Sequence, residues 1–188
     1  MQEAKPKLYG NMILKEDEPI AMVKRGLDSF KEHIDGLYIT ITYKDKEPTT
    51  SPLIDYLKSV GTHLSFFKWV YSFADVRNYA LEQIPRGSNI YIYWQDADDI
   101  NQNPEKMRSV IDLMVQNNIA SVFVPYWYQV ELDDKGAVKE ILIEHKRERL
   151  IRNDGTFKWI GMLHETLIEQ RVENVVKIQR DDFVIIHL

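Results

Sequence analysis

The chain has 188 residues, of which 44% are hydrophobic and 28% are charged, and it contains no cysteine. This length and composition predict one domain with a full-sized core and argue against a disordered chain. With 24 Lys and Arg against 29 Asp and Glu, the net charge of −5 argues against a dedicated duplex-DNA binder, which needs a basic surface. The lack of cysteine excludes a disulfide framework, a thiolate zinc site and a cysteine nucleophile.

The sequence also gives expectations about cellular context. No apolar run approaches the roughly 18–20 residues that a transmembrane helix requires. The first ten residues are polar and lack the apolar stretch of a signal peptide. We therefore expect a cytoplasmic protein. The ten Tyr, seven Phe and four Trp could serve either in the core or in stacking on bases and sugars.

The first part of the chain alternates between strand and helix patterns. β-Branched and aromatic runs predict strands, and apolar residues at helical spacing predict helices. In chain order we expect a strand at 8–14, a helix from Pro19, a strand at 37–43, a helix from Pro52 to Gly61, a strand at 63–67, a helix at 73–84, a strand at 90–94, a helix from Pro104 to Asn117 and a strand at 120–124. This alternation predicts an α/β fold whose mainly parallel central sheet is flanked by helices. The strand at 90–94 is apolar on both sides, as is typical of a central parallel strand.

The remainder of the chain has a different pattern. Residues 127–132 and 137–144 flank the turn sequence Asp133-Asp134-Lys135-Gly136, which predicts a hairpin. Further strand-like runs follow at 149–152, 172–178 and 183–188. We therefore expect a smaller antiparallel C-terminal region. No internal repeat or linker divides the sequence, so we expect a single domain over residues 1–188.

An acidic segment, Asp96-Ala97-Asp98-Asp99, directly follows the predicted central strand. Asp96 and Asp98 are two residues apart, so both carboxylates can face one side of the strand end. Clustered carboxylates repel each other unless a cation lies between them, and hard divalent cations take such oxygen ligands. Open α/β sheets also bind ligands at the carboxyl ends of their strands. The alternative is a solvated acidic turn.

Three further groups could carry chemistry. Arg77 and Asn78, on the helix before the acidic segment, could hold a phosphate or a sugar hydroxyl, or could lie on a solvated helix face. His164 and Glu165 could supply a general base or a metal ligand, although the sequence around His164 alone favours a structural role. His187 ends an apolar strand and has the same two interpretations.

Other features exclude or disfavour particular functions. The basic run at 145–149, with Arg152 and Lys158, is short and contains a glutamate, which favours a solvated face over a nucleic-acid site. The eight glycines form neither a P-loop nor a dinucleotide-binding loop. The sequence also lacks the G-x-S-x-G nucleophile elbow.

The order of several motifs is more specific than any one of them. These motifs are MILKEDE at 12–18 with Leu27-Asp28-Ser29, Trp69 with FADVRNYAL at 73–81, IYWQDADD at 92–99, RLIRN at 149–153 and WIGMLHE at 159–165. Together they resemble glycosyltransferase family 2, whose members are inverting, metal-dependent enzymes with the GT-A fold. The resemblance is strongest to the branch of bacterial lipopolysaccharide-core β-glucosyltransferases and related TPR-associated enzymes.

The resemblance implies a role for each motif. A nucleotide-binding half would occupy about residues 1–100, and an acceptor-side half about residues 101–188. Asp96 and Asp98, completed by His187, would hold Mn²⁺ or Mg²⁺ on the diphosphate of the donor. Glu165, or else His164, would deprotonate the acceptor hydroxyl. The donor-binding residues would be Lys15, Glu16, Asp17, Glu18, Asp45, Arg77, Asn78 and Asp96, with Asp45 replacing an aspartate that relatives carry at the end of the second strand.

The activity implied is inverting transfer of a hexose, by analogy glucose, from a UDP-linked sugar to an acceptor hydroxyl. The basic segment would suit an anionic glycan or a nucleic acid as acceptor, and the oligomeric state is open, with a homodimer as one option. One alternative is a non-catalytic nucleotide-sugar-binding module of a larger assembly. Another is a single-stranded nucleic-acid binder that uses the aromatic side chains and residues 145–158. The chain ends earlier than the relatives do, which indicates either a truncated chain or a minimal enzyme.

Overall fold

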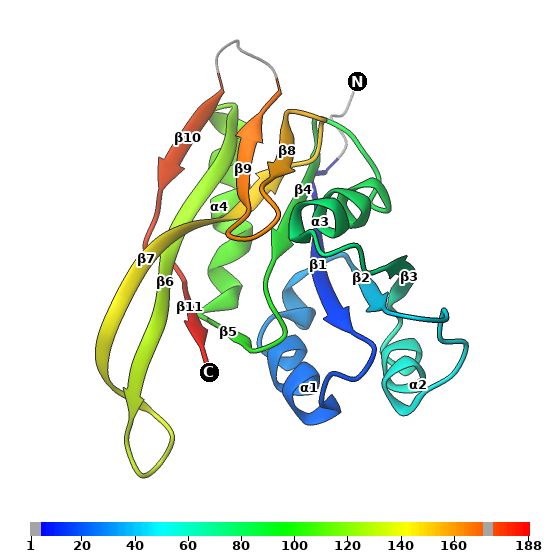
Figure 1. Cartoon of the computed structure of the whole chain (residues 1–188). Coiled ribbons are helices and arrows are strands. Elements are labelled where there is room, and N and C mark those ends of the chain that lie inside the picture. The colour runs from blue at the N-terminus through cyan, green and yellow to red at the C-terminus, as the bar shows by residue number, and fades with distance from the viewer. Residues whose placement is uncertain (1–4, 171–174) are drawn as a thin grey trace.

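The computed structural model describes residues 5–170 and 175–188, and it contains one large mixed sheet between two layers (Figure 1). The strands of this sheet are β1 (Lys7–Lys15), β2 (Gly36–Tyr43), β3 (His63–Lys68), β4 (Ile90–Trp94), β5 (Asp99–Gln102), β6 (Ile119–Leu132), β7 (Val138–Arg152), β10 (Val176–Gln179) and β11 (Val184–His187). A separate antiparallel pair consists of β8 (Phe157–Ile160) and β9 (Thr166–Glu169). The α-helices are α1 (Ile20–Asp28), α2 (Pro52–Ser59), α3 (Phe73–Glu82) and α4 (Met107–Gln116), with short 3₁₀ turns at Lys31–His33 and Pro104–Lys106.

The strand order of the sheet is β3-β2-β1-β4-β7-β6-β11-β5, and β10 also pairs with β6. Strands β3, β2, β1 and β4 are parallel, so their carboxyl ends lie along one edge of the sheet. β7 is antiparallel to both of its neighbours, β4 and β6. β11, close to the C-terminus, runs parallel to β6 and antiparallel to β5. The chain therefore returns at its end to the strand that follows the acidic segment.

The alternation of side chains along β4 shows how the two faces are filled. Tyr91 and Tyr93 belong to the core beneath α1, α2 and α4, whereas Ile92 and Trp94 belong to the core beneath α3, β8 and β9. Successive side chains of a strand point to opposite faces, and all five residues of β4 are buried. This explains why the sequence of β4 is apolar without interruption.

Local sequence accounts for several element ends. The Ser51 hydroxyl accepts a hydrogen bond from the backbone N–H of Ile54 at 3.2 Å and so caps α2. Ser72 caps α3 in the same way by accepting from Asp75 N–H. After α2, Gly61 adopts a φ of +74°, a conformation that glycine tolerates better than other residues. The expected end of that helix is therefore confirmed.

The expected α/β class is confirmed, with a mainly parallel sheet flanked by helices and a small antiparallel sheet. The expected hairpin around residues 133–136 is confirmed, because β6 and β7 pair antiparallel within the main sheet. Each of these strands was expected as two shorter ones, at 120–124 and 127–132 and at 137–144 and 149–152. The small antiparallel sheet of β8 and β9 was not predicted, and β5 was also missed. Part of the strand expected at 172–178 lies outside the described residues, which contain β10 from Val176.

Within the described ranges, the structure has no helix that is both long enough and apolar enough to cross a membrane.

Candidate functional site

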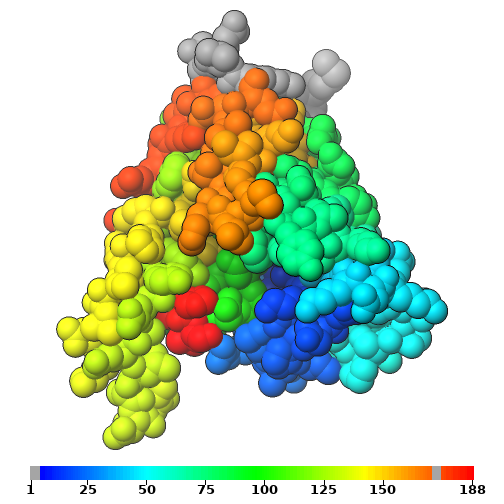
Figure 2. All heavy atoms as spheres, in the orientation of Figure 1, coloured from blue at the N-terminus to red at the C-terminus, as the bar shows by residue number. Residues whose placement is uncertain are grey.

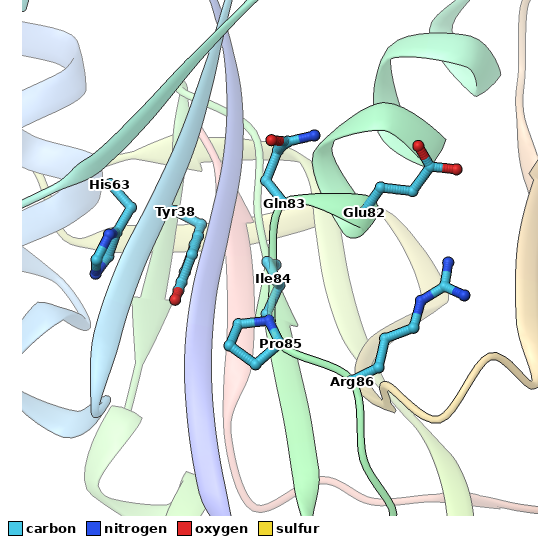
Figure 3. A pocket seen from close by; sticks show the side chains of 7 residues that line it. All are labelled: Tyr38, His63, Glu82, Gln83, Ile84, Pro85 and Arg86. Atoms are coloured by element: carbon cyan, nitrogen blue, oxygen red, sulfur yellow. The ribbon is translucent and has the colours of Figure 1, made fainter.

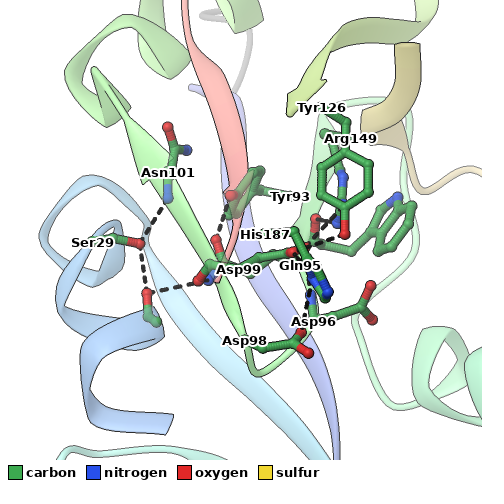
Figure 4. Close-up of polar contacts among 12 residues, drawn as sticks. Ser29, Tyr93, Gln95, Asp96, Asp98, Asp99, Asn101, Tyr126, Arg149 and His187 are labelled. Atoms are coloured by element: carbon green, nitrogen blue, oxygen red, sulfur yellow. Dashed lines mark hydrogen bonds and ion pairs between the residues drawn. The ribbon is translucent and has the colours of Figure 1, made fainter. Parts of the chain in front are cut away.

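The acidic segment lies at the carboxyl end of β4, in the turn that leads into β5 (Figure 4). Gln95 holds this turn in place because its side-chain amide donates to the carbonyl of Gly26 at 3.2 Å and to that of Asp99 at 3.0 Å. The Tyr93 hydroxyl donates to Oε1 of the same Gln95 side chain. The turn is therefore fixed to α1 and to the core, and its carboxylates have defined positions.

Asp99 forms the buried base of the site. Its side chain is fully buried, and one oxygen lies 2.9 Å from Nη2 of Arg149, which is 1% exposed. The other oxygen accepts a hydrogen bond from the Tyr126 hydroxyl at 3.0 Å. The Arg149 guanidinium also lies over the rings of Trp94 and Tyr126, at 4.1 and 4.6 Å from their centroids. A buried carboxylate requires such compensation, because burial disfavours its charged form.

Asp98, Asp99 and His187 form a compact cluster above this base. One ligand atom from each lies within 4.8 Å of the other two. His187 Nδ1 is 3.4 Å from an Asp99 oxygen and 3.6 Å from an Asp98 oxygen. The contact with Asp99 and the nearby charge of Asp98 raise the pKa of His187, although burial opposes this. Burial and the charge of Asp99 likewise raise the pKa of Asp98, against the influence of His187.

The donor set of this cluster fits a divalent metal ion. His187 Nδ1 is buried and has no hydrogen-bond partner among the described residues, although two carboxylates lie close to it. An imidazole nitrogen in this position needs either a proton or a metal ion to compensate it. Carboxylate oxygens suit Mn²⁺ and Mg²⁺, and imidazole is a common additional ligand of transition metals. Asp98 and His187 are the partly exposed members of the set, whereas Asp99 is already engaged by Arg149 and Tyr126.

Asp96 pairs with Arg77, and its contact with a metal ion or a donor stays a prediction. Arg77 donates from Nη2 to Asp96 and from Nε to Glu165, both at 2.7 Å. Arg77 is 6% exposed, so the alternative of a solvated helix face is wrong for this residue. Its guanidinium lies 4.5 Å from the Trp94 ring centroid and 5.1 Å from that of Trp159. Burial would raise the pKa of Asp96, but the charges of Arg77 and Arg149 lower it.

This bridge brings together two motifs that are 69 residues apart, those of Asp96 and Glu165. Asn78, beside Arg77, exchanges two hydrogen bonds of 2.9 Å with the backbone of Trp159 and so attaches α3 to β8. The amide of Asn78 is thereby engaged by protein, and its contact with a donor stays a prediction. His164 is exposed and has a φ of +54°. Glu165, by contrast, is 10% exposed in its side chain and lies in the bridge.

The expected nucleoside-side residues lie at the same edge of the sheet, after β1 and β2. Glu16 connects the two loops, since its backbone N–H donates to Thr42 and its carboxylate accepts from Lys44 N–H at 3.2 Å. This places Asp45 close to the loop of Lys15, Glu16, Asp17 and Glu18. Lys15 lies 3.7 Å from Glu18, and Asp17 and Asp45 are exposed. Their binding of a donor stays a prediction.

From the sequence, we did not expect Arg149 and Tyr126 to belong to the site or Asp99 to support it. Asp99 was part of the recognised acidic segment but was not assigned as a ligand or support. Arg149 was included in a charge run expected to be solvated, and the structure corrects this, because its side chain is fully buried. The signal that was available is that Arg149 directly precedes two apolar residues, Leu150 and Ile151, which lie in the core.

A separate open hollow lies away from this site, at the amino ends of β2 and β3 (Figure 3). It has a volume of about 760 Å³ and includes the stacked rings of Tyr38 and His63, whose centroids are 4.5 Å apart. The rest of the lining comes from residues 82–86, at the end of α3 and in the segment after it. None of the residues that the sequence suggested for catalysis or binding lines it.

No protein-family model and no curated protein matches this sequence. The solved structures that are similar to this chain include two of S. aureus TarS and one of GalNAc-T7. One structure of S. aureus TarS is 13% identical over 63% of this chain and 21% of TarS, with a TM-score of 0.45. A structure of TarS residues 1–349 is 13% identical over 70% of this chain and 38% of that one, with a TM-score of 0.43. GalNAc-T7 with UDP, GalNAc and Mn²⁺ is 11% identical over 89% of this chain and 31% of that one, with a TM-score of 0.49.

The chain thus spans between 21% and 38% of the length of these structures. Since every TM-score is below 0.5, these likenesses assign neither a family nor an activity to the chain. Family 2 and its lipopolysaccharide-core branch stay predictions from the sequence motifs.

Proposed function

We propose that this chain is an inverting, metal-dependent glycosyltransferase domain that moves a hexose, by analogy glucose, from a UDP-linked sugar to an acceptor hydroxyl. The observation that carries the proposal is the arrangement at the carboxyl end of β4. There, Arg77 joins Asp96 to Glu165, and Asp98 lies beside Asp99 and His187. This combines a cation-binding cluster, a buried guanidinium and a candidate base at the edge where α/β sheets bind ligands.

The residues divide the work as follows. Asp98 and His187 would hold Mn²⁺ or Mg²⁺, with Asp96 on the side of the donor. The metal, when bound, would supply positive charge to the leaving diphosphate. Glu165 would take the proton of the acceptor hydroxyl while that oxygen bonds to the anomeric carbon and the bond from this carbon to the diphosphate breaks. Arg77 holds Asp96 and Glu165 at a fixed separation, since both accept from one planar guanidinium.

A second candidate is a module that binds a nucleotide sugar without transferring it. One observation favours it, namely that the candidate base Glu165 is largely buried and already paired with Arg77. Transfer requires the same carboxylate to contact an acceptor hydroxyl. The two functions therefore share a donor site and differ in whether Glu165 reaches a second substrate.

Thermal unfolding with UDP and Mn²⁺ tests the donor site. A ligand that binds only the native state at about 100 times its Kd stabilises it by about 2.7 kcal/mol. For a chain of this size, that corresponds to a rise in Tm of roughly 5–10 °C. Asp98→Ala should abolish the rise, and the matched control Asp134→Ala, in the exposed hairpin turn, should retain it. The donor site is wrongly placed if no pair of nucleoside diphosphate and divalent metal raises the Tm of the wild-type chain.

Release of UDP from UDP-hexoses separates the two candidates. An enzyme should release UDP in a metal-dependent way, and Glu165→Gln should reduce the release at least about 100-fold, the usual worth of a general base. The same variant should keep the Tm response to UDP and Mn²⁺. A wild-type chain that binds UDP but releases none from any UDP-hexose would instead be the binding module.

A further inference from the structure

Among the described residues, only three large apolar side chains are more than half exposed. These are Tyr71 at 76%, Leu163 at 69% and Met162 at 65%, and Val70 follows at 49%. They occupy two loops that are distant in sequence, the loop between β3 and α3 and the loop between β8 and β9. We call Val70, Tyr71, Met162 and Leu163 the apolar lip. Concentrated exposed apolar surface commonly marks a binding site.

The structure holds the two halves of the lip together. The backbone N–H of Phe73 donates to the carbonyl of Met162 at 3.1 Å. Trp69 donates from its backbone N–H to Tyr43 at the end of β2, and its ring packs on Phe73 with centroids 5.0 Å apart. In Figure 2, the β8–β9 segment (orange) stands out from one face of the molecule, beside the green atoms of α3. The lip is therefore built on anchored loops.

Two residues of these loops have a strained backbone. Tyr71 has a φ of +58° and His164 a φ of +54°, in the left-handed region that residues other than glycine rarely adopt. Such strain persists only where the surrounding structure imposes it, and it is concentrated at functional sites. In these loops it accompanies exposed apolar side chains.

The lip continues directly into the candidate active site. Glu165 follows Leu163 by two residues and pairs with Arg77, which also holds Asp96. An acceptor whose hydroxyl reaches Glu165 would therefore lie close to the loop that carries Met162 and Leu163. None of the four lip residues is charged, so this surface would attract an apolar group and would contribute nothing to the binding of an anion.

We propose that the lip is an acceptor subsite for an apolar group, so that the acceptor is an amphipathic molecule with a hydroxyl-bearing head and an alkyl or aryl portion. The proposal rests on the proposed function for the role of Glu165. It replaces the anionic acceptor expected from the basic segment 145–158, because that segment begins on the β6–β7 hairpin and Arg149 within it is buried in the base of the site.

Binding of alkyl glucosides without any donor tests the subsite. Methyl and octyl β-glucoside, the latter below its micelle concentration, are titrated while amide NMR shifts are recorded. Octyl β-glucoside should bind at least about tenfold more tightly, since each buried methylene contributes to affinity. The largest shifts should fall in residues 69–73 and 161–165. Equal affinities, or shifts outside these two loops, would overturn the proposal.

Two matched variants identify the surface. Leu163→Ser should weaken octyl glucoside binding by about three- to tenfold. Leu142→Ser, which removes a 45% exposed leucine from the β6–β7 hairpin, should leave it unchanged. Tyr71→Ser is a second lip variant, to be used if Leu163→Ser lowers the Tm. An equal effect of the lip and hairpin variants would show nonspecific detergent binding and contradict the subsite.

The Tm response to UDP and Mn²⁺, measured on the same samples, separates the subsite from the proposed function. If that response is absent while octyl glucoside still shifts the two loops, the lip stands as an alkyl-glycoside site and the donor assignment fails. If the response is present and the loops do not shift, the subsite alone fails. Light scattering adds one more outcome: a dimer that Leu163→Ser dissociates would make the lip a self-association surface and overturn the proposal.

Discussion

Replacing Asp99 with asparagine should cost far more stability than any surface ion pair of this chain would suggest. The variant keeps the size of the side chain but leaves the Arg149 guanidinium, which is 1% exposed, without its counter-ion at 2.9 Å. Removing one partner of a buried pair typically costs about 3–5 kcal/mol, because the remaining charge stays in a medium of low polarity. Since folded domains are stable by about 5–15 kcal/mol, this is a large fraction of the total.

Urea unfolding followed by tryptophan fluorescence measures the effect, and an unchanged m value would show that the same surface is exposed on unfolding. The loss should also appear as a fall in Tm of roughly 6–20 °C. The control is Asp182→Asn, which breaks the Arg180–Asp182 pair on the surface, where Arg180 is 42% exposed. Such exposed pairs contribute about 0–1 kcal/mol.

A double variant tests whether the uncompensated charge of Arg149 causes the loss of stability. Adding Arg149→Met to Asp99→Asn removes the uncompensated charge and should recover part of the lost stability. If Asp99→Asn cost no more stability than Asp182→Asn, the uncompensated charge of Arg149 would not be the cause of the loss. The same would follow if the losses from Asp99→Asn and Arg149→Met simply added in the double variant.

Three further variants test other features of the fold. Burial would raise the pKa of Asp35, but a backbone N–H of β1 and Arg108 lower it. The contribution of Asp35 to the free energy of unfolding is therefore present at neutral pH and lost in acid. In urea unfolding, Asp35→Asn should cost about 1–2 kcal/mol at pH 7 and progressively less below about pH 4. Gly26→Ala would place a Cβ 3.0 Å from a backbone carbonyl of the acidic segment, and thermal unfolding should show a loss of about 1–2 kcal/mol together with a weaker response to UDP and Mn²⁺. Ser72→Ala removes the cap of α3 and should lower the urea midpoint by an amount equivalent to about 1 kcal/mol.

The parallel part of the fold could be predicted because its physics is local. Residues 90–94 are uninterrupted apolar and aromatic, and a strand covered on both faces requires this. The cap at Ser51 and the glycine at 61 are likewise visible in the sequence. By contrast, β5 could not be predicted, because it contains Asp99 and Asn101, which are polar and yet buried. Their burial depends on partners that are distant in sequence.

That β7 is one continuous strand could not be predicted for the same reason. Its charged stretch from 145 to 149 suggested a solvated face, but Arg149 is compensated by Asp99, which lies 50 positions earlier. Separate strands were expected at 120–124 and 127–132, whereas β6 continues through Pro125. The sequence thus identified the acidic segment and His187 as candidates, while the ion pairs that connect Arg77, Asp96 and Glu165 became visible only in the structure.

The position of β11 has a consequence for how the site forms. His187 is the penultimate residue, and the backbone N–H of Leu188 donates to the carbonyl of Asp98 at 2.9 Å. During synthesis, the four parallel strands can pair long before this last strand emerges from the ribosome. If His187 is a ligand as proposed, a metal ion can bind tightly only after β11 has docked between β6 and β5. Metal affinity should then report the docking of β11, and a variant lacking β11 should retain the parallel strands and bind the metal ion less tightly.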